Sequence, residues 1–172
     1  MKIVANIFSA FQAVCFGIST VQKNEKAIYI LQGLAPAFIT VALVINGGYT
    51  AACMAVITAV ANFLCIKDKL TNAVFAGMMG FIILIAFVTY KQPIDLVSLL
   101  AATEGIAVKK YYKTAKYIHL GMSLNCAFYA VTDMYFRLIP SSICDVAFTV
   151  SSLVSFIRLS KQDRKYLTLS EN

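Results

Sequence analysis

Residues 72–90 read NAVFAGMMGFIILIAFVTY and contain no charged side chain. An apolar helix of about 20 residues is long enough to cross the hydrocarbon core of a bilayer. The stretch has apolar residues on every side of such a helix, which suits lipid or a buried position better than water. It therefore predicts a transmembrane helix in the middle of the chain.

The whole chain has the same apolar character. Of its 172 residues, 60% are hydrophobic and 13% are charged, and the mean hydropathy is +0.77. Soluble domains are about 45–50% apolar and about 25% charged. The composition excludes a disordered chain and argues against a soluble catalytic domain.

Six further apolar runs flank residues 72–90. The breaks between the runs carry turn signals, among them Asn46-Gly47-Gly48 and Lys91-Gln92-Pro93. Connections this short make neighbouring helices antiparallel. We predict an all-α fold, a polytopic membrane protein with seven transmembrane helices over residues 3–20, 27–46, 50–66, 72–90, 94–108, 114–135 and 142–159.

The basic residues are distributed unequally between the two sides of this bundle. Lys and Arg are retained mainly in cytoplasmic loops. The amino terminus and the second, fourth and sixth loops hold three of the 15, namely Lys2, Lys91 and Arg137. The other twelve lie in the first, third and fifth loops and the carboxyl-terminal tail. The asymmetry predicts an outside amino terminus and a cytoplasmic carboxyl terminus.

Several functions are disfavoured by the composition. The net charge of +7 is divided among short loops and forms no continuous basic stripe, so we expect no nucleic-acid partner. The five cysteines lie in apolar runs without CxxC spacing, and only one histidine exists, so we expect no metal site and no cofactor. An HExxH motif or other nucleophile constellation is missing, so we do not expect an enzyme.

The chain resembles itself at a displacement of 88 residues. The matched pattern is A-x-Y-I-x-x-G, at residues 27–33 and 115–121, and after a further shift of three residues Cys53 falls on Cys144. Such self-similarity predicts a repeated structural unit. We predict parallel triple-helix-bundle repeats in a 3+1+3 arrangement, within a single membrane domain over 1–172. Its parts are a first repeat (3–66), a linker helix (72–90), a second repeat (94–159) and a cytoplasmic tail (160–172).

A family resemblance rests on a small set of residues. Gln12, Phe16-Gly17-Ile18, Gln32 and Asn62 with its basic end at Lys67 resemble the YgjV-type family of bacterial inner-membrane proteins, over most of residues 10–160. More remotely, the topology is similar to the SWEET, semi-SWEET and PnuC-type transporters of the MtN3-like superfamily. The resemblance implies a multi-pass protein of the bacterial cell inner membrane. The Pro-Gln pair of PQ-loop relatives is missing, so sugar or vitamin specificity is not implied.

Polar side chains inside the apolar runs are candidates for a solute pathway. An ionisable group in a membrane segment costs roughly 2.5–3.5 kcal/mol and usually faces the bundle interior or a wet cavity. Glu104 and His119 lie equally far from the turn between their helices, so they have a similar depth and could hydrogen-bond. Alternatively, the helix rotations keep the two apart. The candidate substrate-binding or pathway residues are Gln12, Gln32, Asn62, Glu104, His119 and Asn125, although amides also serve as interhelical contacts.

Three further features have local interpretations. Pro36 removes a backbone hydrogen bond in mid-helix, which marks a hinge or an ordinary kink. Ser142-x-x-Asp145 fits a capping box at the start of the last helix. Asp133 and Arg137 have the i,i+4 spacing of an interfacial ion pair.

Two functions from different classes are consistent with the sequence. The first is a transporter or facilitator of a small polar solute, working by alternating access between the two bundles. The second is a non-transporting structural or interaction protein whose polar residues only join helices. We expect the lipid bilayer as a partner in both cases, and an unknown small-molecule solute in the first. Gly77 and Gly80 favour close packing against the bundle or against a second copy in a homo-oligomer.

Overall fold

A computed structural model describes residues 2–21, 25–67, 69–111 and 115–170 of the chain. Within these ranges the protein is all-helical and has no β-strand, which confirms the all-α part of the prediction. The helices are α1 (Lys2–Val21), α2 (Glu25–Ile45), α3 (Tyr49–Ile66), α4 (Asn72–Thr89), α5 (Ile94–Tyr111), α6 (Ala115–Tyr135) and α7 (Ile139–Ser170).

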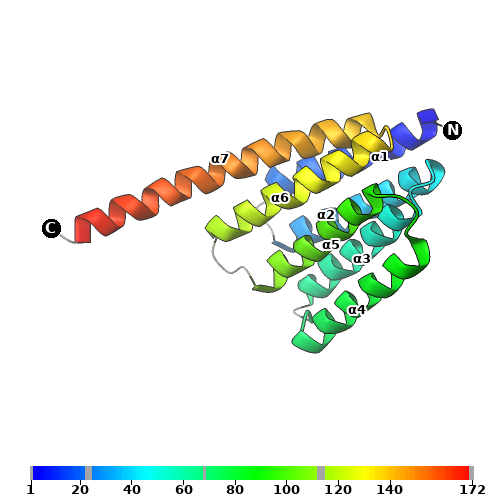
Figure 1. Cartoon of the computed structure of the whole chain (residues 1–172). Helices are drawn as coiled ribbons and strands as arrows, with labels where there is room; N and C mark the ends of the chain where they lie inside the picture. Colours follow the sequence, from blue (N-terminus) through cyan, green and yellow to red (C-terminus); the bar gives the residue numbers. More distant parts are fainter. Residues whose placement is uncertain (1, 22–24, 68, 112–114, 171–172) are drawn as a thin grey trace.

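Six of these helices form a closed ring. Going round the ring, α1 packs against α2, α2 against α3, α3 against α5, α5 against α6, α6 against α7, and α7 against α1 (Figure 1). The linking helix α4 lies outside the ring, where it contacts α3 and α5. Helices α1 and α7 run in the same direction, because Asn6 contacts Ile139 and Phe16 contacts Phe148.

The last helix differs most from its predicted bounds. It begins at Ile139 rather than 142, because Pro140 fits the first helical turn, where a missing N–H leaves no hydrogen bond unmade. It also continues past residue 159 to Ser170 and projects beyond the other helices (Figure 1). The predicted tail is therefore a helical extension of α7 as far as residue 170.

The turns that end α2 and α6 have the same backbone geometry. Gly47 has a φ of 81° and Arg137 a φ of 59°, so each turn passes through the left-handed region. In both turns an N–H then bonds back to a carbonyl inside the helix, from Gly48 to Leu43 and from Leu138 to Asp133, each at 2.8 Å. The equivalent residues of the two turns are 90 positions apart, as are Asn46 and Phe136.

The two turns also touch each other. Asn46 Nδ2 donates a hydrogen bond to the carbonyl of Phe136 at 2.8 Å. The Phe136 ring lies so close to Gly48 that an added Cβ would be 2.8 Å from Cζ, which explains the glycine at this position. We call this end of the ring the turn end. The opposite end carries Lys67, Lys69, Lys109 and Lys110 and is called the lysine end.

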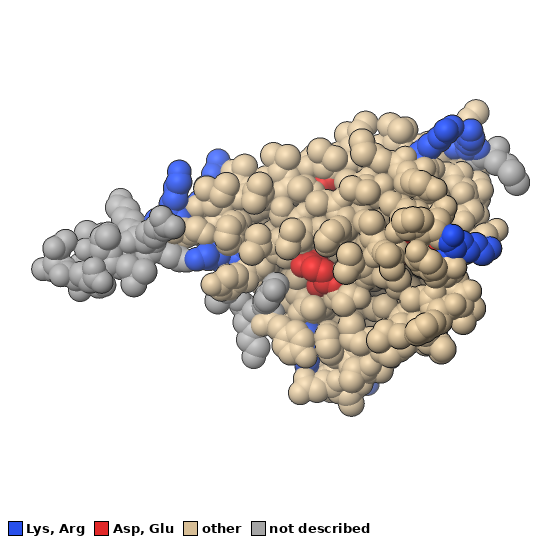
Figure 2. Space-filling model, in the orientation of Figure 1, with Lys and Arg blue, Asp and Glu red and all other residues tan. Residues whose placement is uncertain are grey.

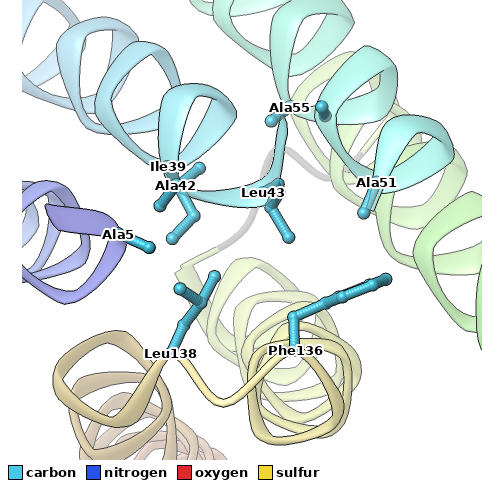
Figure 3. Packing of buried hydrophobic residues seen from close by; sticks show 9 residues of the cluster. Ala5, Ile39, Ala42, Leu43, Ala51, Ala55, Phe136 and Leu138 are labelled. Carbon is cyan, nitrogen blue, oxygen red and sulfur yellow. The ribbon is translucent and has the colours of Figure 1, made fainter. Parts of the chain in front are cut away.

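A cluster of buried apolar side chains fills the ring at the turn end. Leu138 of the α6–α7 turn points toward Ala5 of α1 and Leu43 of α2, and the ring of Phe136 extends toward the α3 side of the cluster, where Ala51 lies (Figure 3). We call this set the plug; its buried members are Ala5, Ile39, Ala42, Leu43, Ala51, Ala52, Ala55, Phe136 and Leu138.

The outer surface of the helices is suited to lipid. Figure 2 shows basic side chains toward the edges of the molecule, while most of the surface between them is uncharged apart from a small acidic patch near its centre. Large apolar residues such as Phe81, Phe87 and Val88 are exposed on α4. Among the described residues, the helices that are long and apolar enough to cross a membrane are four: α1, α3, α4 and α7.

Of the other three helices, which were also predicted to cross the membrane, α5 and α6 are less apolar than α1, α3 and α4. Among its described residues, helix α2 contributes the apolar segment Gly33–Ile45. Helices α5 and α6 carry Asp95, Glu104, Asn125 and Asp133 among their residues. Of these, Glu104, Asn125 and Asp133 face the inside of the ring. A helix that faces a polar interior needs apolar residues only on its outer side, which lowers its mean hydropathy.

Candidate functional site

The helix ring encloses a cavity of about 410 Å³. The plug closes the cavity at the turn end, since three of its residues, Ile39, Leu43 and Ala55, also line the cavity. From there the cavity extends to Lys109 and Ile118 near the lysine end. All six ring helices contribute residues to its wall, so the cavity lies along the axis of the ring.

Most of the predicted pathway residues lie on this wall. Gln12, Asn62, Glu104 and Asn125 line the cavity, and so does Pro36 of α2. The side chain of Gln32 lies outside the described part of the structure. The hinge role of Pro36 stays a prediction.

The Glu104–His119 hydrogen bond is not formed. Glu104 accepts a hydrogen bond from Asn125, whose Nδ2 also donates to the carbonyl of Ala101 at 2.6 Å. The second carboxylate oxygen, Oε2, is buried and has no hydrogen-bond partner within the described ranges. Gly105 and Gly121 make room for this arrangement, because a Cβ on Gly105 would lie 2.7 Å from Asn125 Nδ2 and one on Gly121 2.8 Å from Glu104 Oε1.

His119 belongs to a different face of α6. It shares the helical stripe of Ser123, Cys126 and Ala130, which are spaced three or four residues apart. This stripe faces α7, since Ser123 donates to the carbonyl of Thr149 at 3.2 Å. His119 is not among the residues that line the cavity. Of the two explanations left open by the sequence, the one in which helix rotation separates Glu104 from His119 holds.

Two carboxylates of the cavity were assigned to other roles in the sequence analysis. Asp145 is not a cap of α7, because that helix begins at Ile139 and Asp145 lies in its second turn. It is 4% exposed and lines the cavity. Starting the helix at Pro140, a residue favoured in the first turn, would have shown this from the sequence.

The predicted ion pair of Asp133 with Arg137 is also wrong. Asp133 is 2% exposed and lines the cavity, whereas Arg137 is exposed in the left-handed turn that follows α6. The i,i+4 spacing implies contact only if the helix continues through both residues. Helix α6 ends at Tyr135, so the helical geometry is lost between them.

A hydrogen-bonded chain connects Asp133 to α1 through α7. Ser141 Oγ lies in hydrogen-bond contact with Asp133 Oδ2 and, at 2.8 Å, with Gln12 Oε1. A serine hydroxyl has one proton and cannot donate to two acceptors. The contacts are satisfied if the Gln12 amide is turned so that its nitrogen donates to Ser141, or if Asp133 carries a proton. The hydrogen bonds among Asp133, Ser141 and Gln12 can therefore form in two ways, one with Asp133 charged and one with Asp133 neutral.

A second polar contact crosses the cavity between α3 and α6. Tyr129 and Thr58 both line the wall, and their oxygens are 3.2 Å apart. Thr58 donates its proton to the carbonyl of Met54 at 3.0 Å, so the Tyr129 hydroxyl is the donor to Thr58. The sequence analysis did not select either residue, because a tyrosine or threonine in an apolar run has no distinctive spacing.

The described residues contain no group of three or more His, Cys, Asp or Glu side chains placed to hold a metal ion. The cavity wall instead combines amides, hydroxyls and carboxylates from α1, α3, α5, α6 and α7 with an apolar surface from α2. Such a wall can bind a small molecule that has both polar and apolar parts.

A ring of helices with an apolar outer surface, around a cavity whose wall carries both polar and apolar side chains, is typical of a helical integral membrane protein. The family model described as Bacterial inner membrane protein, Imp-YgjV, matches residues 3–163. The chain therefore belongs to this YgjV-type family of bacterial inner-membrane proteins, as its sequence predicted. Comparisons with curated proteins and with solved structures found no match.

Proposed function

We propose that this protein is a transporter or facilitator that carries a small polar solute across the inner membrane by alternating access. The observation that carries the proposal is the cavity of about 410 Å³ along the axis of the helix ring. Sites for small molecules measure about 300–1,000 Å³. A helix bundle that serves only as a scaffold gains nothing from an internal polar space, because close packing stabilises it better.

The proposal treats α1–α3 and α5–α7 as two three-helix units joined by α4, all seven helices crossing the membrane in a 3+1+3 arrangement. A two-fold axis through the ring would exchange α1 with α5 and α3 with α7. It would turn the α3–α5 contact into an α7–α1 contact, and both contacts are present. The turns after α2 and α6, which would be exchanged by this axis, meet at the turn end through the Asn46–Phe136 hydrogen bond. These features support two rigid units that rock against each other.

The equivalent residues of the two turns are 90 positions apart, so they favour a displacement of 90 residues between the repeats. The sequence pattern in the second helix of each repeat had indicated a displacement of 88. At 90 residues, Gly33 corresponds to Ser123. Gly33 lies against Phe63 of α3, and Ser123 bonds to α7, so both face the third helix of their unit. Gly121, which the sequence pattern matches to Gly33, faces Val108 of α5 instead. The A-x-Y-I-x-x-G pattern therefore does not mark equivalent faces.

The distribution of basic residues orients the proposed transporter. In the sequence, twelve of the 15 Lys and Arg residues belong to the first, third and fifth connections and the carboxyl-terminal part of the chain, and Lys67, Lys69, Lys109 and Lys110 of this group lie at the lysine end, the side predicted to be cytoplasmic. In this orientation the amino terminus is outside and the carboxyl terminus is inside. The cavity reaches toward the cytoplasm, and the plug closes it from the outside. The arrangement corresponds to an inward-facing state of an alternating-access cycle.

Single-cysteine labelling tests the proposal. In a variant whose five native cysteines are replaced by serine or alanine, Asn62→Cys, Thr58→Cys and Asn125→Cys place a thiol on the cavity wall. We expect each to react with a membrane-impermeant maleimide from either side of oriented vesicles. Ala42→Cys is the control, because Ala42 is fully buried in the plug and should stay protected in the inward-facing state. Protection of all three wall positions from both sides would favour the non-transporting alternative, in which polar residues only join helices.

A further inference from the structure

The ionisable side chains of the cavity are unequally paired. Three carboxylates, Glu104, Asp133 and Asp145, share the wall with one lysine, Lys109. Glu104 has a hydrogen bond from Asn125 and lies within electrostatic range of Lys109. Asp133 and Asp145 have no basic neighbour in the described part of the chain. The cavity therefore has an excess of negative groups at the turn end.

Asp145 is the clearest indication of a missing partner. Its side chain is 4% exposed and lies on the cavity wall, and it makes no hydrogen bond to any described residue. Asp133 lies within electrostatic range and has one oxygen held by Ser141. A buried carboxylate without a partner is costly, and a second carboxylate nearby increases the cost. A positive group in the cavity next to these two residues would remove it.

The surroundings indicate which kind of cation fits. The described residues offer no set of three acidic, His or Cys ligands for a metal ion. The cavity wall also has an apolar surface on α2, formed by Pro36, Ile39 and Leu43, and α2 lies opposite α6, the helix of Asp133, in the ring. Tyr129 adds an aromatic ring to the same part of the wall, and aromatic faces attract alkylated ammonium groups.

We propose that the solute of this cavity is a small organic cation, with its ammonium group at Asp145 and Asp133 and its alkyl part against Pro36, Ile39 and Leu43. The inference rests on the proposed function, because it names the class of solute that the same cavity binds. Helices α6 and α7 supply the charge, and α2 supplies the apolar surface.

Thermal unfolding of the purified protein in detergent tests the inference with matched probes. The probes are methylammonium, tetramethylammonium, guanidinium and choline chlorides, measured at constant ionic strength against sodium chloride. The neutral isostere of choline, 3,3-dimethylbutan-1-ol, has nearly the same shape without the charge. Binding to the folded state raises the apparent Tm. We expect at least one of the cations to raise the Tm and the neutral isostere to leave it unchanged.

Two variants assign the effect to the carboxylates. We expect Asp145→Asn to weaken binding of the stabilising cation about tenfold or more, because it removes one member of a buried charge pair. Asp95→Asn is the matched control: Asp95 is also a buried aspartate, but it accepts hydrogen bonds from the N–H groups of Lys91 and Gln92 at the start of α5 and does not line the cavity. This variant should keep the affinity of the wild type. The comparison of choline with its isostere needs no variant and remains valid if Asp145→Asn does not fold.

Two results would overturn the inference. In the first, none of the cations raises the Tm of the wild-type protein. In the second, a cation raises the Tm of the wild type and of Asp145→Asn equally. Stabilisation by neutral polar solutes alone would also overturn it and leave the transporter proposal intact. The transporter proposal fails separately, if the cavity cysteines are protected from both sides of the membrane.

Discussion

The two contacts of the helix ring that would join the proposed three-helix units, the α1–α7 seam and the α3–α5 seam, are built differently. At the α1–α7 seam, side chains of α1 bind the free N–H groups in the first turn of α7: Asn6 accepts from Ile139 at 3.1 Å and Ser9 from Ser141 at 2.9 Å. At the α3–α5 seam, the contacts come largely from apolar side chains. They are Met54, Ile57 and Ala61 of α3 with Ala102 and Ile106 of α5, supported by Ile82 of α4.

The polar contacts of the first seam and the apolar contacts of the second constrain the helices to different degrees. The first N–H groups of a helix have no partner within that helix, so a side chain from another helix that binds them fixes the position of its end. Apolar contacts are not directional, and within a bilayer they are held by close packing rather than by the hydrophobic effect. If the proposed units move against each other, we therefore expect the α1–α7 seam to set their alignment and the α3–α5 seam, which α4 contacts on both sides, to shift at smaller cost.

The largest effect is expected from breaking the polar seam with Ser141→Ala. This substitution leaves the buried side chains of Gln12 and Asp133 without their shared partner and should lower the free energy of unfolding by about 2–3 kcal/mol. Thermal unfolding in detergent measures the change. Ser155→Ala is the control on the same helix, since the Ser155 hydroxyl bonds only to the carbonyl of Ser151 at an exposed site. Equal destabilisation by the two substitutions would show that the seam does not depend on this contact.

A smaller effect is expected where the seams meet at the turn end. Gly48→Ala places a Cβ 2.8 Å from the Phe136 ring, which must move, and overpacking of this kind costs about 1–2 kcal/mol. Replacing Phe136 by leucine in the same chain should recover part of the loss, because the smaller side chain leaves room for the Cβ. A double-mutant cycle of Tm values measures the coupling. Additive effects of the two substitutions would contradict the contact.

The smallest effect is expected at the apolar seam. Ile106→Val removes one methyl group from a fully buried side chain and should cost about 0.5–1 kcal/mol. If this seam tolerates small shifts, the affinity of the cavity for its probe cation stays unchanged. Ile83→Val serves as the control, since Ile83 is 58% exposed on α4 and should show almost no change in Tm. A loss of affinity in Ile106→Val would mean that the apolar seam also sets the geometry of the cavity.

The apolar runs and their turn signals were sufficient to place all seven helices. Both properties are local: the length of an apolar run sets the length of a helix, and Gly, Pro and charged residues interrupt it. The same local information was insufficient for α7, where residue 142 was chosen as the start because the apolar run begins there. Pro140, which lies in the first turn, indicated the earlier start of the helix at Ile139, and this start places Asp145 inside the helix.

The sequence by itself determined that this is an all-helical membrane protein and that Gln12, Asn62, Glu104 and Asn125 are unusual for their surroundings. Which polar side chains share one space was decided only by the tertiary structure, because that depends on the rotation of each helix about its axis. An i+1 change in position turns a side chain by about 100° around a helix with 3.6 residues per turn. For this reason His119 faces α7 while Asn125 meets Glu104, and Asp133 and Asp145, which looked like interfacial residues, face the cavity.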